Sequence, residues 1–364
     1  MRADASNSMS IRIESLDGLR GVAILFVLIW HYFNNLVVPE PNTLIGFFHL
    51  LSKMMWSGVD LFFVLSGFLI GRILLINIDS LNYYSTFYIR RFYRIFPLYY
   101  ILITIFLILS FFQSEANLVR YIPFYLYLNN YSYFVSYNDS FEAVSLSVAW
   151  SLAVEEQFYL FVPLLVRVAH KHLGVTLVVI VFSGPLLRAF SEYPYSYTWM
   201  PARTDSLILG VFMAYVCSKN GSRDFLCKYM RPACVVIISL VAYLWLLLNQ
   251  SSIGGVANHF VLSLIYASII LLVMFHSSSF FTRALGTKSL IWIGRRSYAI
   301  YLFHMFFLAS FGLWAGDVHV LGLELWQKLT IVCASTIVTL IVADILFRYV
   351  ETPLIARGHR YRYK

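Results

Sequence analysis

Long apolar blocks dominate the sequence. They run for roughly 17 to 22 residues between short polar joints, which is long enough to cross the ~30 Å hydrocarbon core of a bilayer as helices. Charged residues make up only 12% of the chain, whereas a soluble domain has about a quarter. We therefore predict an all-α polytopic integral membrane protein, a bundle of about ten transmembrane helices. The predicted spans cover residues 18–37, 57–76, 95–112, 148–168, 175–190, 206–217, 233–248, 260–275, 291–313 and 329–347.

The positions of Lys and Arg predict how the chain is oriented. Basic residues favour cytoplasmic joints, and here they collect in alternate joints, whereas joint 249–259 has none. A shorter apolar stretch, residues 121–135, is left out of the count, because including it would place the basic joints outside. Both termini are then cytoplasmic. The basic joints are residues 72–94, 167–172, 219–231, 283–296 and 348–364. The predicted divisions are a cytoplasmic segment (1–14), a membrane domain (15–353) and a basic cytoplasmic tail (354–364).

This charge pattern also accounts for the net charge of +9 without a nucleic-acid partner. The four cysteines have neither CxxC spacing nor a His-rich tract around them. We expect a protein with reduced cysteines and no metal. The cysteines are Cys217, Cys227, Cys234 and Cys333.

The first span carries three ionisable residues on one predicted helical face. Arg20 and His31 are eleven residues apart, which corresponds to about 16 Å along a helix axis. Asp17 lies one turn before Arg20, at the cytoplasmic end. Ionisable groups in a membrane helix are costly and usually line a cavity or pathway. A snorkelling Arg and a His bonded to a neighbouring helix would give the same pattern.

Further acidic residues lie inside apolar blocks. Asp60 falls near the outer end of the second span and needs a partner such as an Arg, a His or backbone amides. Downstream in that span, Gly67 and Gly71 are four residues apart, which favours close helix packing. In the span that begins near residue 148, we choose Glu155 over the adjacent Glu156. The predicted face of Glu155 also carries Ser151 and Tyr159.

Two arginines, Arg91 and Arg94, share one helical face at the cytoplasmic end of the third span. Two guanidinium groups so placed can bind phosphate, although a positive-inside anchor would look the same. Several polar residues map to the outer half of the membrane: His31, Glu155, Asp60, the Arg203/Asp205 pair and His304. Tyr301 and His304 share one helical face. We predict that Arg203, Asp205, Tyr301 and His304 bind the acceptor substrate. A phosphate site inside and an acid/base cluster outside could bring an intracellular activated donor to an extracytoplasmic acceptor.

Six motifs occur in a fixed order: SLDGLRGVAILFVLIWH, GVDLFFVLSGFL, YIRRFYRIFPLYY, WSLAVEEQFYLFVP, RTDSLILG and SYAIYLFH. Together they resemble the membrane-bound acyltransferase 3 family of bacterial O-acyltransferases, over residues 15–353. The resemblance implies transfer of an acyl group, usually acetyl from acetyl-CoA, to a hydroxyl of a carbohydrate such as lipopolysaccharide O-antigen, capsule, exopolysaccharide or peptidoglycan. It also implies a bacterial cytoplasmic (inner) membrane location.

By the same resemblance, His31 and Arg20 match the essential pair of the family, Arg91 and Arg94 match its donor motif, and Glu155 matches its essential acid. We expect no hydrolase-like domain after Pro353, so transfer is completed by the chain alone or with a separate extracytoplasmic acyl-handling partner.

These residues suggest two versions of the chemistry. His31 acts as general base, with Glu155 or Asp60 orienting it, or it accepts the acyl group first as a nucleophile. Arg20, Arg91 and Arg94 would hold the CoA phosphates. The alternative from another class is a transporter or flippase with an intramembrane Arg/His/Glu pathway, but the two halves of the sequence show no internal repeat.

Overall fold

The computed structural model describes residues 2–34, 36, 43–112, 118–131, 141–219, 238–239, 241–242, 256–276 and 279–364. These residues form helices and turns and contain no strand, so the prediction of an all-α fold is confirmed. The chain divides into two compact units. Unit 1 comprises Met1–Trp30, Pro39–Ile76 and Leu164–Ser297, and unit 2 comprises His31–Val38, Asn77–Pro163 and Tyr298–Lys364.

Eight helical stretches in the described residues are long and apolar enough to cross a membrane, and each coincides with a predicted span. The protein is thus a polytopic membrane protein. The predicted span 206–217 corresponds to a shorter helix of 15 residues, α10, and the predicted span 233–248 lies largely outside the described residues. The eight stretches are Glu14–Asn34, Leu44–Ile76, Tyr83–Phe111, Ala149–Val168, His170–Ala189, Asn258–Phe275, Ser297–Trp314 and Leu325–Gly358.

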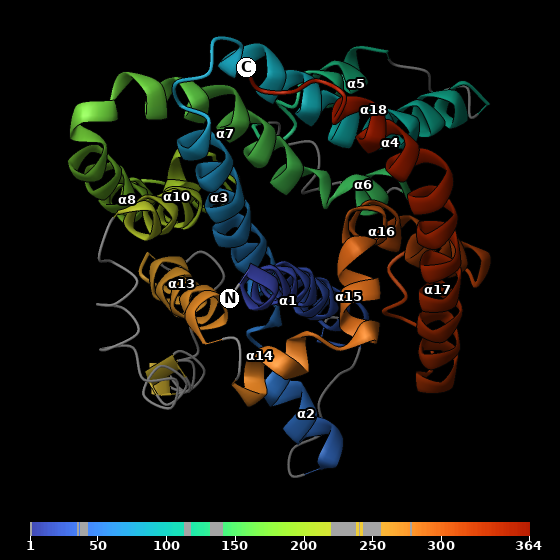
Figure 1. The fold of residues 1–364 in the computed structure, drawn as a ribbon. Coiled ribbons are helices and arrows are strands. Elements are labelled where there is room, and N and C mark those ends of the chain that lie inside the picture. Colours follow the sequence, from blue (N-terminus) through green and yellow to red (C-terminus); the bar gives the residue numbers. More distant parts are fainter. Residues whose placement is uncertain are drawn as a thin grey trace. The chain divides into compact units, whose positions relative to one another are not determined.

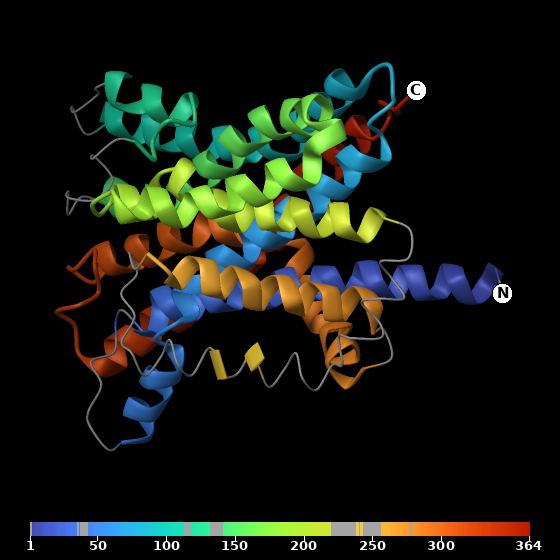
Figure 2. The same cartoon turned by 90° about the vertical axis from the view of Figure 1, so that its left-hand side faces the viewer.

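Unit 1 is held together by close helix packing around α3 and α10 (Figure 1). A Cβ atom on Gly67 would collide with the backbone oxygen of Leu207, and one on Gly210 with that of Val64. The predicted packing role of Gly67 and Gly71 is therefore confirmed. Helix α1 packs on α3, α13 and α15, and Figure 2 shows it running beside α13. The helices of this unit are α1 (Arg2–Ile29), α2 (Leu44–Ser52), η2 (Met55–Ser57), α3 (Gly58–Ile76), η4 (His170–His172), α8 (Leu173–Ala189), α9 (Tyr195–Thr198), η5 (Pro201–Arg203), α10 (Thr204–Ser218), α13 (Asn258–Phe275), α14 (Phe280–Leu285) and α15 (Lys288–Arg295).

Unit 2 contains the long helix α4 and the segments that follow α1 and α15. Helix α5 has only eight residues, far fewer than the ~20 needed to span a bilayer, which supports leaving this stretch out of the span count. Helix α7 belongs to unit 2 up to Pro163. The helices of unit 2 are η1 (Trp30–Asn34), α4 (Tyr83–Phe112), α5 (Leu118–Tyr125), α6 (Phe141–Leu146), α7 (Ala149–Val168), α16 (Ser297–Trp314), α17 (Leu325–Leu346), η6 (Phe347–Glu351) and α18 (Thr352–Gly358).

The predicted span 291–313 was wrong at its start. The chain forms a separate helix, α15, which ends at Arg295, and the membrane helix α16 begins at Ser297. Charged side chains at the junction favour this break, because Arg295 pairs with Asp17 and the guanidinium of Arg296 lies over the Trp292 ring. His304 is therefore the eighth residue of its helix, about two turns from the start, rather than about four turns.

Candidate functional site

His31 lies in an unusual stretch of backbone. Helix α1 ends at Ile29, and Trp30–Asn34 form a single π-helical turn, η1. Such turns occur often at functional sites, because the extra residue changes the direction of the side chains. Here it lets two consecutive side chains, His31 and Tyr32, both reach α16. The unit boundary falls between Trp30 and His31, so Arg20 and His31 belong to different units.

The imidazoles of His31 and His304 lie together in unit 2. Nδ1 of His31 is 3.3 Å from Nε2 of His304, and the ring centroids are 5.0 Å apart. The Tyr32 hydroxyl donates to the backbone oxygen of His304 at 2.8 Å. The sequence placed His31 and His304 at similar depths, and the structure brings them into contact. His304 is fully buried.

Tyr301 connects this pair to α7. Its hydroxyl lies 2.6 Å from the Ser151 hydroxyl and donates to the Val148 carbonyl at 3.1 Å. Its ring centroid is 5.7 Å from that of His304, as the spacing of the two residues on one helical face predicts. Ser151 on α7 therefore contacts Tyr301 on α16 and joins the candidate site.

The acidic pair of α7 lies further along the same helix. The Tyr159 hydroxyl donates to Oε2 of Glu155 at 3.0 Å, so the predicted one-turn relation is present. The Tyr159 ring also lies under the guanidinium of Arg91, 5.8 Å from its centroid. The neighbouring Glu156, which the sequence analysis set aside, has a buried Oε1 atom without a hydrogen-bond partner among the described residues. Both acids are therefore placed inside unit 2.

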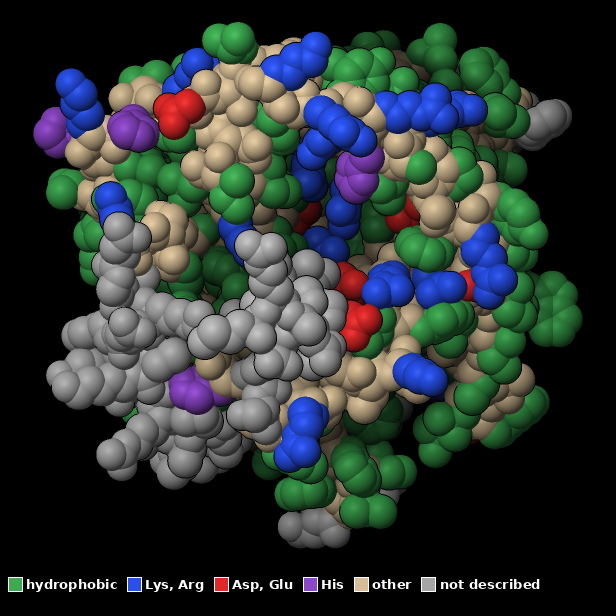
Figure 3. Space-filling view, viewed as in Figure 1, with side chains coloured by type: hydrophobic (Ala, Val, Ile, Leu, Met, Phe, Trp, Pro, Cys, Tyr) green, Lys and Arg blue, Asp and Glu red, His purple; other side chains and the backbone are tan. Residues whose placement is uncertain are grey.

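The two arginines of the predicted phosphate site lie on α4, close to the last residues of the chain. Packing of α18 on α4 is tight, because a Cβ on Gly358 would lie 3.1 Å from that of Tyr93. Burial, and then the positive charges of Arg90, Arg94 and Arg91, lower the pKa of His359. His359 thus lies within reach of three guanidinium groups. Figure 3 shows Lys and Arg side chains gathered with a His over α18 and the beginning of α4.

The predicted basic tail is ordered against this region. The Arg90 Nε atom donates to the backbone oxygen of Tyr361 at 2.9 Å, and the rings of Tyr93 and Tyr361 stack with centroids 6.4 Å apart. The Arg90 guanidinium also lies over the Tyr363 ring. The tail therefore covers Arg90 and joins the surroundings of the two predicted phosphate ligands.

Arg20 and Asp17 lie in unit 1, in the middle part of α1, where α15 packs against it. Nη1 of Arg20 is 3.6 Å from Oδ1 of Asp17, and Nε of Arg295 is 3.1 Å from Oδ2. The predicted Asp17/Arg20 couple is present. Arg20 keeps 23% of its side chain exposed, so a ligand can reach it.

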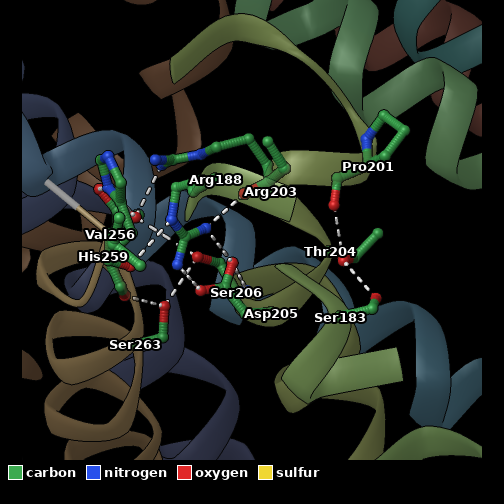
Figure 4. Close-up of polar contacts among 12 residues, drawn as sticks. Ser183, Arg188, Pro201, Arg203, Thr204, Asp205, Ser206, Val256, His259 and Ser263 are labelled. Atoms are coloured by element: carbon green, nitrogen blue, oxygen red, sulfur yellow. Dashed lines mark hydrogen bonds and ion pairs between the residues drawn. The ribbon is translucent and has the colours of Figure 1, made fainter. Parts of the chain in front are cut away.

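Asp60 belongs to a buried polar cluster in unit 1, and Figure 4 shows Arg203, Ser206 and His259 of this cluster. Its Oδ1 accepts a hydrogen bond from Nη2 of Arg203 at 2.7 Å and lies 3.1 Å from Nδ1 of His259. The Ser206 hydroxyl donates to the same oxygen at 3.3 Å. All four side chains are fully buried. An Arg, a His or backbone amides were the predicted partners of Asp60, and the structure supplies both an Arg and a His.

Arg203 and Asp205, which the sequence analysis treated as a pair, do not pair with each other. Asp205 accepts two hydrogen bonds from the guanidinium of Arg188, at 2.5 Å and 3.0 Å, while Arg203 pairs with Asp60. The reason is helical spacing, since residues two apart point in different directions. The sequence analysis missed Arg188 and His259, although each is an ionisable residue in or beside an apolar block.

Known proteins resemble this chain over nearly its whole length. The acyltransferase 3 family model, described as an acyltransferase domain, matches residues 13–348. The peptidoglycan O-acetyltransferase OatA of Listeria monocytogenes is 30% identical over 95% of this chain and 56% of that protein. YrhL of Bacillus subtilis, whose name assigns it provisionally to the same activity, is 28% identical over 96% of this chain and 56% of that protein.

A Staphylococcus aureus protein with a provisional O-acetyltransferase name is 26% identical over 95% of this chain and 58% of its own length. The chain thus spans less than two thirds of these relatives. No solved structure matches it. The family model covers far more than half of the residues, and the chain therefore belongs to the acyltransferase 3 family.

Proposed function

We propose that this protein is a transmembrane O-acyltransferase that moves an acetyl group from cytoplasmic acetyl-CoA to a hydroxyl of an extracytoplasmic carbohydrate. The observation that carries the proposal is the composition of unit 2, where His31 and the Arg91/Arg94 pair occur in one compact body. Between them along α7 and α16 lie Tyr159, Glu155, Ser151, Tyr301 and His304. The Arg91/Arg94 pair suits binding of a phosphorylated donor, and His31 suits proton transfer.

Arg91 and Arg94 would bind the CoA phosphates, because guanidinium groups form strong charge-assisted hydrogen bonds with phosphate oxygens. Arg20 lies in unit 1, and its predicted role as a phosphate ligand stays a prediction. The thioester would then extend along α7 toward His31. In this arrangement Glu155, held by Tyr159, provides negative charge beside the path, and the hydroxyls of Ser151 and Tyr301 offer hydrogen bonds to the reacting groups.

The acceptor class is inferred from the relatives and from the buried polar side chains. The Listeria protein is named for acting on peptidoglycan, so we propose a cell-surface glycan, which could be peptidoglycan, O-antigen, capsule or exopolysaccharide. Arg203 and Asp205 lie buried in unit 1, and their predicted role in acceptor binding stays a prediction. We propose cytoplasmic termini from the distribution of basic joints, and a bacterial cytoplasmic membrane location from the similarity to bacterial relatives.

The proposal is tested with the purified full chain in detergent or nanodiscs. We expect acetyl-CoA to be consumed in the presence of glycan acceptor, and the glycans of cells carrying the protein to contain ester-linked acetyl groups. His31→Ala should abolish both signals, since it removes the group that takes the hydroxyl proton. His170→Ala, at an exposed residue outside unit 2, is the matched control. Normal ester content in the His31 variant would exclude this mechanism.

A further inference from the structure

The hydrogen bonds around His304 determine which nitrogen it can offer to His31. Nδ1 of His304 lies 2.7 Å from the backbone oxygen of Tyr301. A carbonyl oxygen can only accept, so Nδ1 must carry the proton and donate it. Burial makes a charged ring costly, and His304 is fully buried. In the neutral ring, Nε2 then has no proton and can only accept.

The same reasoning extends to His31. Its Nδ1 faces the accepting Nε2 of His304 at 3.3 Å, so Nδ1 of His31 must be the donor. In the neutral His31 ring the unprotonated, basic nitrogen is then Nε2. A chain of two hydrogen bonds, beginning at the Tyr301 carbonyl, fixes the tautomer of both rings.

We infer that His304 is a positioning residue that holds the proton of His31 on Nδ1 and thereby presents Nε2 of His31 as the reactive nitrogen. This inference rests on the proposed function of His31 and replaces the substrate-binding role that we predicted for His304. The neutral imidazole of His304 fixes the tautomer of His31, which is one of the two functions of the buried carboxylate in a Ser-His-Asp triad.

The transfer step is balanced as follows. Nε2 of His31 accepts the proton of the acceptor hydroxyl while the oxygen forms a bond to the thioester carbonyl carbon. The carbon–sulfur bond then breaks, and the sulfur leaves with the electron pair. The thiolate takes the proton from Nε2, giving an acetyl ester and CoA thiol. The Nδ1 proton stays between the two imidazoles throughout, and a nucleophilic role for His31 would use the same Nε2.

Tyr32 forms a second contact between the π-turn and α16. Its hydroxyl bonds to the backbone oxygen of His304, so the π-turn is fastened to α16 by a contact that does not involve the imidazoles. Tyr32→Phe removes that fastening and keeps both rings, which makes it the matched control for packing.

The experiment uses the full chain with nitrogen-15 in its nine histidines, reconstituted in nanodiscs. The His31 signals are identified by their loss in His31→Gln. We expect wild-type His31 to be protonated at Nδ1 and unprotonated at Nε2. In His304→Phe this preference should be lost, and turnover should fall by roughly 10² to 10⁴-fold. The KM for acetyl-CoA should change by less than about threefold, since positioning affects the chemical step.

His304→Gln provides the rescue, because its side-chain oxygen can accept a hydrogen bond from the Nδ1–H group of His31. We expect at least about tenfold more activity than in His304→Phe, and Tyr32→Phe should stay within about tenfold of the wild type. A wild-type spectrum with the proton on Nε2 of His31 overturns the inference, and so does normal turnover in His304→Phe. Full activity in His31→Ala would instead refute the proposed function, whatever the tautomer.

Discussion

Replacing Asp60 with Asn should destabilise unit 1 strongly. Asp60 accepts hydrogen bonds from Arg203 and Ser206 and contacts His259, and its side chain is fully buried. Asparagine keeps the shape but removes the negative charge. Arg203 would then remain as a buried cation without a counter-charge, which typically costs about 3 to 5 kcal/mol.

Among the described residues, few groups can stabilise the positive charge of Arg203 once the Asp60 carboxylate is removed. Its Nε and Nη1 atoms have no hydrogen-bond partner among the described residues. Its remaining contacts are the faces of Phe63 and Tyr197, each 5.4 Å from the guanidinium carbon. Cation–π contacts of this kind contribute about 0.5 to 2 kcal/mol, and they are already present. We therefore expect Asp60→Asn to lower the free energy of unfolding by an amount near the upper end of the range of about 3 to 5 kcal/mol.

The assay is unfolding of the purified protein in mixed micelles with increasing SDS, followed by tryptophan fluorescence. Asp79→Asn, the same change at an exposed residue, should leave the unfolding curve within about 0.5 kcal/mol of the parent. Adding Arg203→Met to Asp60→Asn should recover part of the loss, because it removes the orphaned charge. An Asp60→Asn protein that unfolds like the parent but has lost transfer would refute this reasoning and place Asp60 in the chemistry.

Three further predictions concern the donor site and the orientation. Arg91→Ala together with Arg94→Ala should weaken acetyl-CoA binding by about 1.5 to 3 kcal/mol per lost phosphate contact; calorimetry showing unchanged affinity would leave the pair as a topological anchor. A bound polyanion should raise the pKa of His359, which burial and then the neighbouring arginines lower in the free protein. Donor affinity should therefore rise as pH falls, with proton uptake that His359→Ala removes; equal uptake in both proteins would contradict this. An impermeant thiol reagent applied outside should label a Cys introduced into joint 249–259 and miss one introduced into 219–231, and the reverse pattern would invert the topology.

Local spacing explains what the sequence could predict. The contacts of Tyr159 with Glu155 and of Arg20 with Asp17 each join residues within one helical turn, so helix geometry alone places them together. The close packing at Gly67 was predictable for the same reason, since a face of small residues is a property of one helix. Apolar block length predicted eight spans that the structure describes as helices.

Contacts between distant residues could not be predicted in this way. Asp60 and Arg203 are 143 positions apart, and His31 and His304 are 273 apart. Hydropathy shows that such side chains need partners, but it does not show which helices are neighbours. The π-turn at His31 and the break before Ser297 were also missed. The π-turn depends on contacts with α16, and the break depends on the contact between Arg295 and Asp17. Neither is encoded in the period of apolar residues.

The two buried clusters differ in the kind of chemistry they can support. In unit 1 the carboxylates of Asp60 and Asp205 accept hydrogen bonds from arginines. In a buried ion pair of this kind the carboxylate stays ionised and the guanidinium stays protonated. In unit 2 the central contact joins two imidazoles, and a neutral imidazole donates from one ring nitrogen while the other is free to accept a proton. Proton transfer is therefore better assigned to His31 than to Asp60. Among the predicted acids, Glu155, which lies in unit 2 and accepts a hydrogen bond from Tyr159, is the better candidate to support it.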